Sequence, residues 1–274
     1  MSNYVDLHSH ILHAIDDGPD TLNEAVSLGR AYVSAGFDTV VATPHATEGR
    51  PKPGLILERL AELQGELKRL RIPLTLLPGA EQHIEPLTLK RLQNGELLTL
   101  NNTRYLLLEL PFFQPLPPYA LTLIADIATA GYIPVIPHPE RAVSLQQNPQ
   151  LLFELHEAGA LFQVTWGALS GKLGPAARRV ADYMLSVNLT HFFATDAHRP
   201  TTRLIQLEKP LGILTEKKGA DFAAVVLTER PRKLIENQKL DLPPATMSAP
   251  GKGSTYPANY RTPLITRLRR RIGR

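Results

Sequence analysis

The sequence predicts an α/β protein built as a distorted seven-stranded (β/α) barrel. Short apolar runs alternate seven times with longer amphipathic segments, which indicates parallel strands that are each covered on the outside by a helix. The chain has 274 residues, a length at which such a barrel forms one large domain. Seven strands rather than eight make the barrel irregular, and an open doubly wound sheet is the alternative architecture.

The expected elements follow one another in regular order. Strands are predicted at residues 4–8, 38–43, 74–78, 104–110, 133–137, 161–165 and 191–195. Helices are predicted at residues 22–35, 55–70, 119–130, 149–158 and 175–187, and Gly36, Gly131 and Gly159 are expected to end three of them. A last helical region is expected over residues 212–238, with 220–227 and 231–236 as its clearest pieces.

The composition changes near residue 241. We expect residues 1–240 to form the barrel, and residues 241–274 to form a Pro/Gly-rich linker and a basic C-terminal tail. Residues 243–274 contain seven basic and no acidic side chains, so the rest of the chain carries −3 of the net charge of +4. Because this part of the chain is mildly acidic, we expect no nucleic-acid partner. Apolar residues at 264, 268 and 272 would allow the tail a weak contact with a membrane or an acidic partner.

Two absences narrow the chemistry and the compartment. The chain has no cysteine, which excludes disulfides, thiolate metal sites, iron–sulfur clusters and a cysteine nucleophile. The N-terminus lacks a basic region leading into an apolar run, and no uninterrupted apolar run approaches the roughly 20 residues that span a bilayer. We therefore expect a cytoplasmic protein whose metal ions, if any, are held by nitrogen and oxygen.

Imidazoles and carboxylates stand at the ends of six predicted strands and in the first loop. They are His8, His10, Asp17, His45, Glu81, Glu109, His138, Asp196 and His198. Because the C-terminal ends of parallel barrel strands meet at one face, these side chains should converge. Residues i and i+2 of a strand project to the same side, so His8 and His10 should share an ion while Leu7 faces away. The set exceeds what one tetrahedral ion needs and suits two or three divalent ions.

The same residues lie in six short motifs, in a specific order over about residues 1–240. The motifs are Asp-Leu-His-Ser-His from residue 6, Ile-Asp-Asp-Gly-Pro from residue 15, Thr-Pro-His ending at residue 45, Gly-Ala-Glu ending at residue 81, His-Pro-Glu-Arg from residue 138 and Thr-Asp-Ala-His ending at residue 198. Together they resemble the polymerase and histidinol phosphatase (PHP) superfamily. More narrowly, they resemble its metal-dependent protein-tyrosine phosphatases of bacterial capsule and exopolysaccharide synthesis.

The resemblance implies a function and a ligand set. The function is hydrolysis of phosphotyrosine on a partner protein, a membrane-anchored tyrosine autokinase that controls polysaccharide export. The site would hold three ions, usually manganese, with iron or zinc as alternatives. His8, His10, Glu81 and Asp196 would hold the first ion, Glu81, Glu109 and His138 the second, and Asp17, His45 and His198 the third. Arg141 and Arg203 would bind phosphate, and Asp196 or His198 could assist proton transfer.

Two rival functions and several neighbouring residues stay open. The rivals are a small-molecule phosphomonoesterase of the histidinol-phosphatase type and a metal-binding regulatory module without turnover. Asp6 is expected to orient an imidazole and Asp16 to shape its loop. Arg199 is the alternative to Arg203 as the second phosphate-binding arginine. Phe112, Phe113 and Trp166 suit either an apolar rim of the site or ordinary packing. His13 departs from the pattern of the resembling family, so we expect it to bear on specificity.

Overall fold

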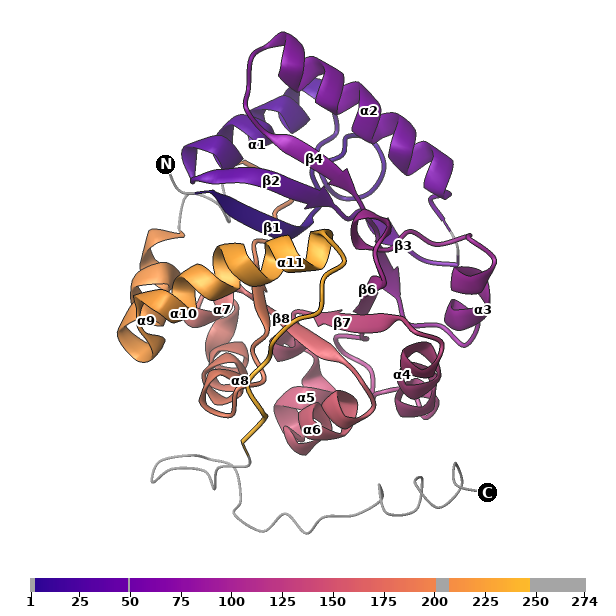
Figure 1. Ribbon diagram of the computed structural model, residues 1–274, viewed down its shortest axis with the longest axis vertical. Coiled ribbons are helices and arrows are strands. Elements are labelled where there is room, and N and C mark those ends of the chain that lie inside the picture. Colours follow the sequence, from indigo (N-terminus) through magenta and orange to yellow (C-terminus); the bar gives the residue numbers. More distant parts are fainter. Residues whose placement is uncertain (1–2, 49, 201–206, 247–274) are drawn as a thin grey trace.

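The computed structural model of the protein describes residues 3–48, 50–200 and 207–246. Figure 1 shows strands gathered at the centre with helices arranged around them. The strands are β1 (Tyr4–Ser9), β2 (Phe37–Ala42), β3 (His45–Ala46), β4 (Thr75–Pro78), β5 (Glu81–His83), β6 (Tyr105–Glu109), β7 (Ile133–Pro137), β8 (Leu161–Thr165) and β9 (Phe192–Ala194). The seven predicted strands are thus present, and two of them continue beyond a break, as β3 after β2 and as β5 after β4.

The five predicted helices are confirmed to within about two residues at each end. They are α1 (Leu22–Ser34), α2 (Pro53–Arg69), α4 (Ala120–Thr129), α6 (Gln150–Glu157) and α8 (Gly174–Ser186). The last helical region begins earlier than predicted and comprises α9 (Glu208–Lys218), α10 (Ala220–Ala224), a π-helical turn (Val225–Glu229) and α11 (Arg230–Ile235). Shorter helices that the sequence did not indicate are α3 (Thr88–Gln93), α5 (Val143–Gln147) and α7 (Trp166–Leu169), with 3-10 turns at Leu100–Asn102 and Pro139–Arg141.

Every pair of neighbouring strands is parallel within the described residues. One sheet has the order β1-β2-β4 and the other the order β3-β5-β6-β7-β8-β9. The end of β9 returns to β1, because the Asp196 backbone N–H donates to the His8 carbonyl at 3.0 Å and the His10 N–H donates to the Ala197 carbonyl at 2.9 Å. These bonds bring the end of the last strand beside the first, and the two parallel sheets agree with the predicted α/β fold of the distorted-barrel type.

The breaks in the second and third strands have local causes. Pro44, between β2 and β3, has no N–H to donate to a neighbouring strand. Gly79, between β4 and β5, passes so close to β2 that a Cβ atom there would lie 2.9 Å from the Val41 side chain. Each break shifts the end of its strand, and the residues that resume pairing there are His45 and Glu81, which are direct neighbours in the register of β3 and β5.

Two apolar clusters hold the fold together. The larger cluster lies between strands and outer helices, and a smaller one lies among inward-facing strand residues such as Val5, Leu7 and Leu107. Leu234 of α11 completes the inner cluster. Nearby, Arg232 pairs with Asp38 at 2.7 Å and the Tyr105 hydroxyl donates to the Gln238 carbonyl at 2.9 Å. Since Asp38 and Tyr105 lie at strand beginnings, α11 covers the N-terminal end of the barrel.

After α11 the chain continues to pack against the barrel as far as residue 246, where the described range ends. Leu240 and Leu242 pack on the inner cluster, and the Thr246 N–H donates to the Val187 carbonyl at 3.0 Å. The predicted tail from residue 247 onward lies outside the described residues, and the domain boundary near residue 240 stays a prediction. Within the described ranges, no helix combines the length and the apolar character needed to cross a bilayer.

Candidate active site

Four of the predicted ligand residues meet where β1, β5 and β9 come together. The His8 Nε2 and His10 Nε2 atoms lie 3.1 Å apart. Each of them lies 3.3 Å from Glu81 Oε2, and Asp196 Oδ1 is 3.6 Å from His8 and 3.4 Å from His10. All four side chains are buried. They are the four residues that the family resemblance assigns to a first ion.

The Glu81 carboxylate connects this group to a second one. Its Oε1 lies 2.7 Å from His138 Nε2, and its Oε2 lies 2.9 Å from His45 Nδ1. Glu109 stands farther away, at 3.9 Å from each of these two imidazoles. One buried carboxylate thus faces imidazoles from several strands, which is the geometry of a bridging ligand.

A third group lies at the mouth of the site. His198 Nε2 is 3.2 Å from Asp17 Oδ1, and His45 Nε2 is 3.7 Å from the same oxygen. The ring of His10 stacks on that of His198 with centroids 3.9 Å apart, so one nitrogen of His10 also borders this group. Asp17 is the most exposed member, with 66% of its side chain accessible.

Backbone irregularities aim several of these side chains. The register of β1 against β2 shifts between Asp6 and Ser9, which is how a bulge reorients a strand residue. Leu7 packs in the inner cluster, yet His8 also points into the site, so the strict alternation that we predicted for β1 does not hold. His138 and Asp196 adopt left-handed backbone conformations with φ of 34° and 51°. Residues without a glycine's freedom seldom do so, and such positions concentrate at functional sites.

The electrostatics of the site favour positive charge. Burial alone would lower the pKa of His10, but hydrogen bonds to Asp16, Asp196 and Glu81 raise it well above the usual value. Burial likewise opposes ionisation of Glu81, and the surrounding His8 and His138 nevertheless hold its pKa well below normal. The Glu81 carboxylate therefore stays charged in a buried place, which normally requires a compensating cation.

The buried residues fit divalent metal ions. The Glu81 Oε2 atom is buried and has no hydrogen-bond partner, although three imidazole nitrogens lie within 3.3 Å of it. Three sets of nitrogen and oxygen atoms are close enough to share an ion: His8 with His10 and Glu81; His45 with Glu81 and Glu109; and His10 with Asp17, His45 and His198. Imidazole and carboxylate donors suit zinc, manganese or iron.

A cavity of about 290 Å³ opens over these groups. Arg141 lines it and donates from Nη1 to Asp196 Oδ2 at 3.1 Å, while its guanidinium lies 4.2 Å from the centre of the Phe112 ring. The Phe112 ring also meets the edge of His138. A cation, an aromatic face and the candidate metal ligands thus border one small volume.

Residues 4–236 match the protein family described as capsular polysaccharide synthesis, CpsB/CapC. The chain belongs to the CpsB/CapC family. It is 38% identical over 238 residues to the tyrosine-protein phosphatase YwqE of Bacillus subtilis, which covers 86% of this chain and 93% of YwqE. A crystal structure from work on YwqE and on CpsB of Streptococcus pneumoniae, described as metal-dependent tyrosine phosphatases, superposes with a TM-score of 0.83 at 37% identity. That match covers 88% of this chain and 98% of the crystallised one.

A more distant likeness concerns the fold alone. The histidinol phosphate phosphatase of Lactococcus lactis superposes with a TM-score of 0.50 at 12% identity, covering 80% of this chain and 95% of the other. The predicted membership of the capsule branch is confirmed by the CpsB/CapC match, and the fold agrees with the predicted PHP type.

Two residues beside the candidate site, Asp16 and Gln163, make contacts with its histidines that the sequence did not predict. Asp16 accepts from His10 Nδ1 at 2.7 Å and from the His45 backbone N–H at 3.1 Å, so it fixes the His10 ring and the backbone at His45. Gly18 lets this loop pass, because a Cβ there would lie 2.2 Å from the His10 carbonyl oxygen. Gln163 of β8 contacts His8 Nδ1 at 3.0 Å. For Asp16, the adjacent candidate ligand Asp17 was a signal in the sequence. For Gln163 the sequence contains no such signal.

Other neighbouring residues differ from their predicted places. Asp6 does not hold an imidazole: its carboxylate accepts from the Tyr32 hydroxyl at 2.7 Å and the Thr195 N–H at 3.1 Å, which ties β1 to α1 and β9. His13 points to α2, where its Nε2 lies 3.3 Å from Glu62. Trp166 is buried and stacks on a core phenylalanine.

Two arginines after β9, Arg199 and Arg203, are candidates for binding phosphate. Arg199 pairs with Asp20 and Glu24 at 3.2 and 3.1 Å. It is thus engaged at α1. Arg203 lies outside the described residues, and its assignment to phosphate stays a prediction.

Proposed function

We propose that this chain is a metal-dependent protein-tyrosine phosphatase. The observation that carries the proposal is the buried Glu81 carboxylate set among His8, His10, His45 and His138, in a family whose named members are tyrosine phosphatases. Two or three divalent ions would occupy the site, with manganese as the preferred ion and iron or zinc as alternatives.

The ligand assignment follows the three groups. His8, His10, Glu81 and Asp196 would hold the first ion, and Glu81 would share the second with Glu109 and His138. Asp17, His45 and His198 would hold the third, at the mouth. Asp16 and Gln163 would fix the rings of His10 and His8 through their second nitrogens.

Bound ions of this kind lower the pKa of water and neutralise charge on phosphoryl oxygens, which provides hydrolysis without a cysteine nucleophile. The protein's own residues bind and orient the phosphoester. Arg141, held by Asp196, presents its remaining N–H groups to the cavity, where a guanidinium suits bidentate contact with phosphate. Arg203 would add a second such contact. Asp196 or His198 would assist proton transfer to the leaving phenolate, which needs less protonation than an alkoxide.

We further propose that the substrate is a phosphotyrosine-bearing protein in the cytoplasm, specifically a membrane-anchored tyrosine autokinase that regulates polysaccharide synthesis and export. The Phe112 ring beside Arg141 supports an aromatic phosphoester, because it offers a flat apolar surface next to the phosphate-binding cation. The histidinol-phosphatase alternative is not favoured, since its structural likeness extends to the fold alone.

The test is a substrate and metal panel on purified protein. After removal of metal with a chelator and addition of manganese, iron or zinc, turnover is measured on a phosphotyrosine peptide, a phosphoserine peptide and histidinol phosphate. We expect turnover only with metal and a clear preference for phosphotyrosine. Preference for histidinol phosphate would reject the proposal, and metal binding without any turnover would indicate the regulatory module.

Two variants connect the activity to the site. His138→Ala should lower kcat/KM by roughly 100-fold or more, because it removes a buried group in contact with Glu81. His13→Gln is the matched control, since this histidine of the first loop contacts α2 instead. Equal activity of the two variants would contradict the metal assignment.

A further inference from the structure

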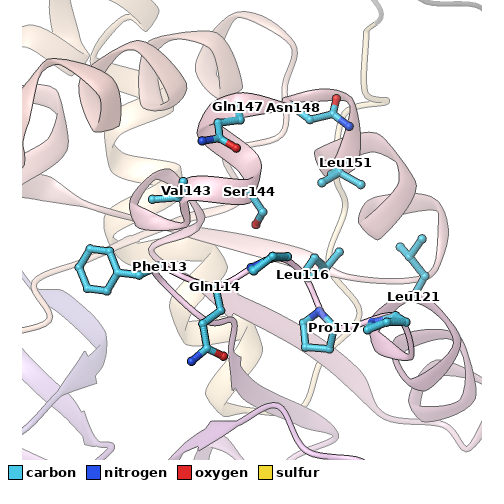
Figure 2. Close-up of a pocket in the computed structure, with 12 residues that line it drawn as sticks. Phe113, Gln114, Leu116, Pro117, Leu121, Val143, Ser144, Gln147, Asn148 and Leu151 are labelled. Atoms are coloured by element: carbon cyan, nitrogen blue, oxygen red, sulfur yellow. The ribbon is translucent and has the colours of Figure 1, made fainter.

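We propose that a groove beside the catalytic cavity binds the part of the substrate protein that flanks the phosphotyrosine. This inference rests on the proposed function. The flanking groove, defined by Phe113, Leu116, Leu121, Val143, Ser144 and Leu151, has a volume of about 540 Å³. It lies between the loop after β6 and helices α5 and α6, with Phe113 and Val143 at one end and Leu121 and Leu151 at the other (Figure 2).

Both walls of the flanking groove continue directly from the catalytic cavity. Phe112 lines the cavity and Phe113, the next residue, lines the groove. On the other wall, Arg141 lines the cavity and Val143 lines the groove. The Val143 N–H donates to the Phe112 carbonyl at 2.8 Å, which joins a segment that lines the groove to one that lines the cavity. A chain that leaves the cavity on this side therefore enters the groove.

The lining of the groove indicates what it binds. Phe113 is 87% exposed, which is unusual for a large apolar side chain. Leucine and proline side chains form most of the remaining surface, and none of the lining residues carries a charge. The amides of Gln114, Gln147 and Asn148 stand at its edge, and the Ser144 hydroxyl is buried without a hydrogen-bond partner. Such a surface suits an extended segment with an apolar side chain, whose peptide groups can pair with the amides.

The distance along the substrate can be stated. The ring centres of Phe112 in the cavity and Phe113 in the groove lie 6.3 Å apart. An extended chain advances about 3.3 Å per residue, so a side chain two or three residues from the phosphotyrosine would reach the near end of the groove. Small phosphoesters occupy the cavity alone and do not reach it. The groove thus favours phosphotyrosine within a polypeptide over the free amino acid, and favours apolar over charged neighbours.

The experiment compares large and small substrates on manganese-loaded full-length protein. Phe113→Ala and Leu116→Gln are assayed on p-nitrophenyl phosphate, on a phosphotyrosine peptide with leucine two and three residues from the phosphotyrosine, and on the same peptide with aspartate there. The control is Leu57→Ala, on the outer surface of α2 and 44% exposed. We expect kcat/KM for the leucine peptide to fall about 10-fold in both groove variants, with p-nitrophenyl phosphate unchanged and the control like wild type.

Four outcomes would overturn the groove. Equal losses on peptide and p-nitrophenyl phosphate would show an effect on the cavity itself, and unchanged peptide kinetics would show that the substrate runs elsewhere. A smaller mass of Phe113→Ala in light scattering would identify the groove as a contact between two copies of the chain. Failure of the wild type to hydrolyse any phosphotyrosine would reject the proposed function together with the groove, whereas the other results leave that function standing.

Discussion

At the scale of single residues, the site depends on side chains that the fold holds in costly states. The Glu81 carboxylate is charged although it is fully buried, and His138 and Asp196 have positive φ angles. Each such backbone conformation costs on the order of 1 kcal/mol or more. The hydrogen bonds of Asp196 to His8 and of His138 to Gln163 through the main chain hold these conformations in place. A bound cation would neutralise the buried charge and so offset part of this cost.

The contact between Gln163 and His8 allows metal binding at this site to be tested. Its Nε2 lies 3.0 Å from His8 Nδ1, while its Oε1 is buried without a partner. A histidine that binds metal through Nε2 carries a proton on Nδ1, which needs an acceptor. We expect the amide to turn over when metal binds, so that Oε1 accepts this proton and gains the partner it lacks.

Replacing Gln163 should therefore change metal affinity rather than folding alone. We expect Gln163→Leu to weaken manganese binding about 10- to 100-fold in calorimetric titration, and Gln163→Glu, which retains an acceptor, to stay within a few-fold of wild type. Gln82→Leu is the matched control, because Gln82 is a buried glutamine of β5 whose amide donates to the His83 carbonyl. Identical affinities for the leucine variants at both positions would contradict the assigned role.

The candidate ligands could be predicted because barrel topology alone sends strand ends to one face. The residues that orient them could not. Asp16 and Asp17 are adjacent carboxylates in one loop, and only the path of the loop over His10 decides that Asp16 contacts the ring while Asp17 faces the mouth. Gln163 lies within an apolar strand, where the sequence gives no sign of its contact with His8.

At the scale of elements, helices were easier to predict than the details of strands. Amphipathic periodicity extends over several turns, whereas a strand can break or bulge at a single residue. The breaks at Pro44 and Gly79 separate two predicted strands from short continuations, β3 and β5, that were not predicted, and the register shift in β1 reverses the expected side of Leu7. All three irregularities lie next to the candidate site, where they aim His8, His45 and Glu81.

The contact between β8, β9 and α6 contains a histidine that should make stability depend on pH. The Nδ1 atom of His191 accepts from the Phe162 N–H at 2.9 Å, and its Nε2 is buried without a partner. Burial, and then the nearby His156 and Arg230, lower its pKa well below the usual value. The folded state therefore resists protonation of His191 while the unfolded state accepts it near pH 6.5, so stability is lost as the pH falls below that value.

His191→Asn removes the titrating group and retains an acceptor for the Phe162 N–H. Between pH 7.5 and pH 5, His191 should account for a loss of up to about 2 kcal/mol in the free energy of unfolding, the limit set by its ordinary pKa in the unfolded state. We therefore expect the variant to lose less stability than wild type over this range by about that amount, in urea unfolding followed by circular dichroism. Parallel pH profiles for the two proteins would show that His191 is not the responsible group.

At the scale of the whole molecule, the two ends of the barrel have separate tasks. The C-terminal ends of the strands carry the candidate site, and α11 with the residues after it covers the opposite end. The alternation of strands and helices predicted this architecture. It did not indicate that residues 241–246 also pack against the barrel. Residues 241–246 include three prolines or alanines that bury little, and their composition indicates a linker. Only the folded barrel provides the apolar surface on which Leu242 packs.

Two truncations test where the folded unit ends. A chain that stops after residue 246 keeps the Leu242 contact and the hydrogen bond from Thr246 to Val187, and loses only a segment with little to bury. We expect its thermal midpoint and its phosphatase activity to equal those of the full chain. A chain that stops after residue 240 loses these contacts and the hydrogen bond from Asn188 to the Pro244 carbonyl, which together contribute about 1–3 kcal/mol.

The shorter chain should accordingly unfold about 3–8 °C lower in differential scanning fluorimetry, while its kcat/KM below that temperature stays near wild type. Leu242→Ala in the full-length protein separates packing from chain length and should give part of the same decrease. If truncation after residue 240 leaves the midpoint unchanged, the boundary predicted from composition is correct and the contacts of residues 241–246 do not contribute to stability. If truncation after residue 246 also lowers it, the basic tail contributes to the folded state, contrary to what its composition indicates.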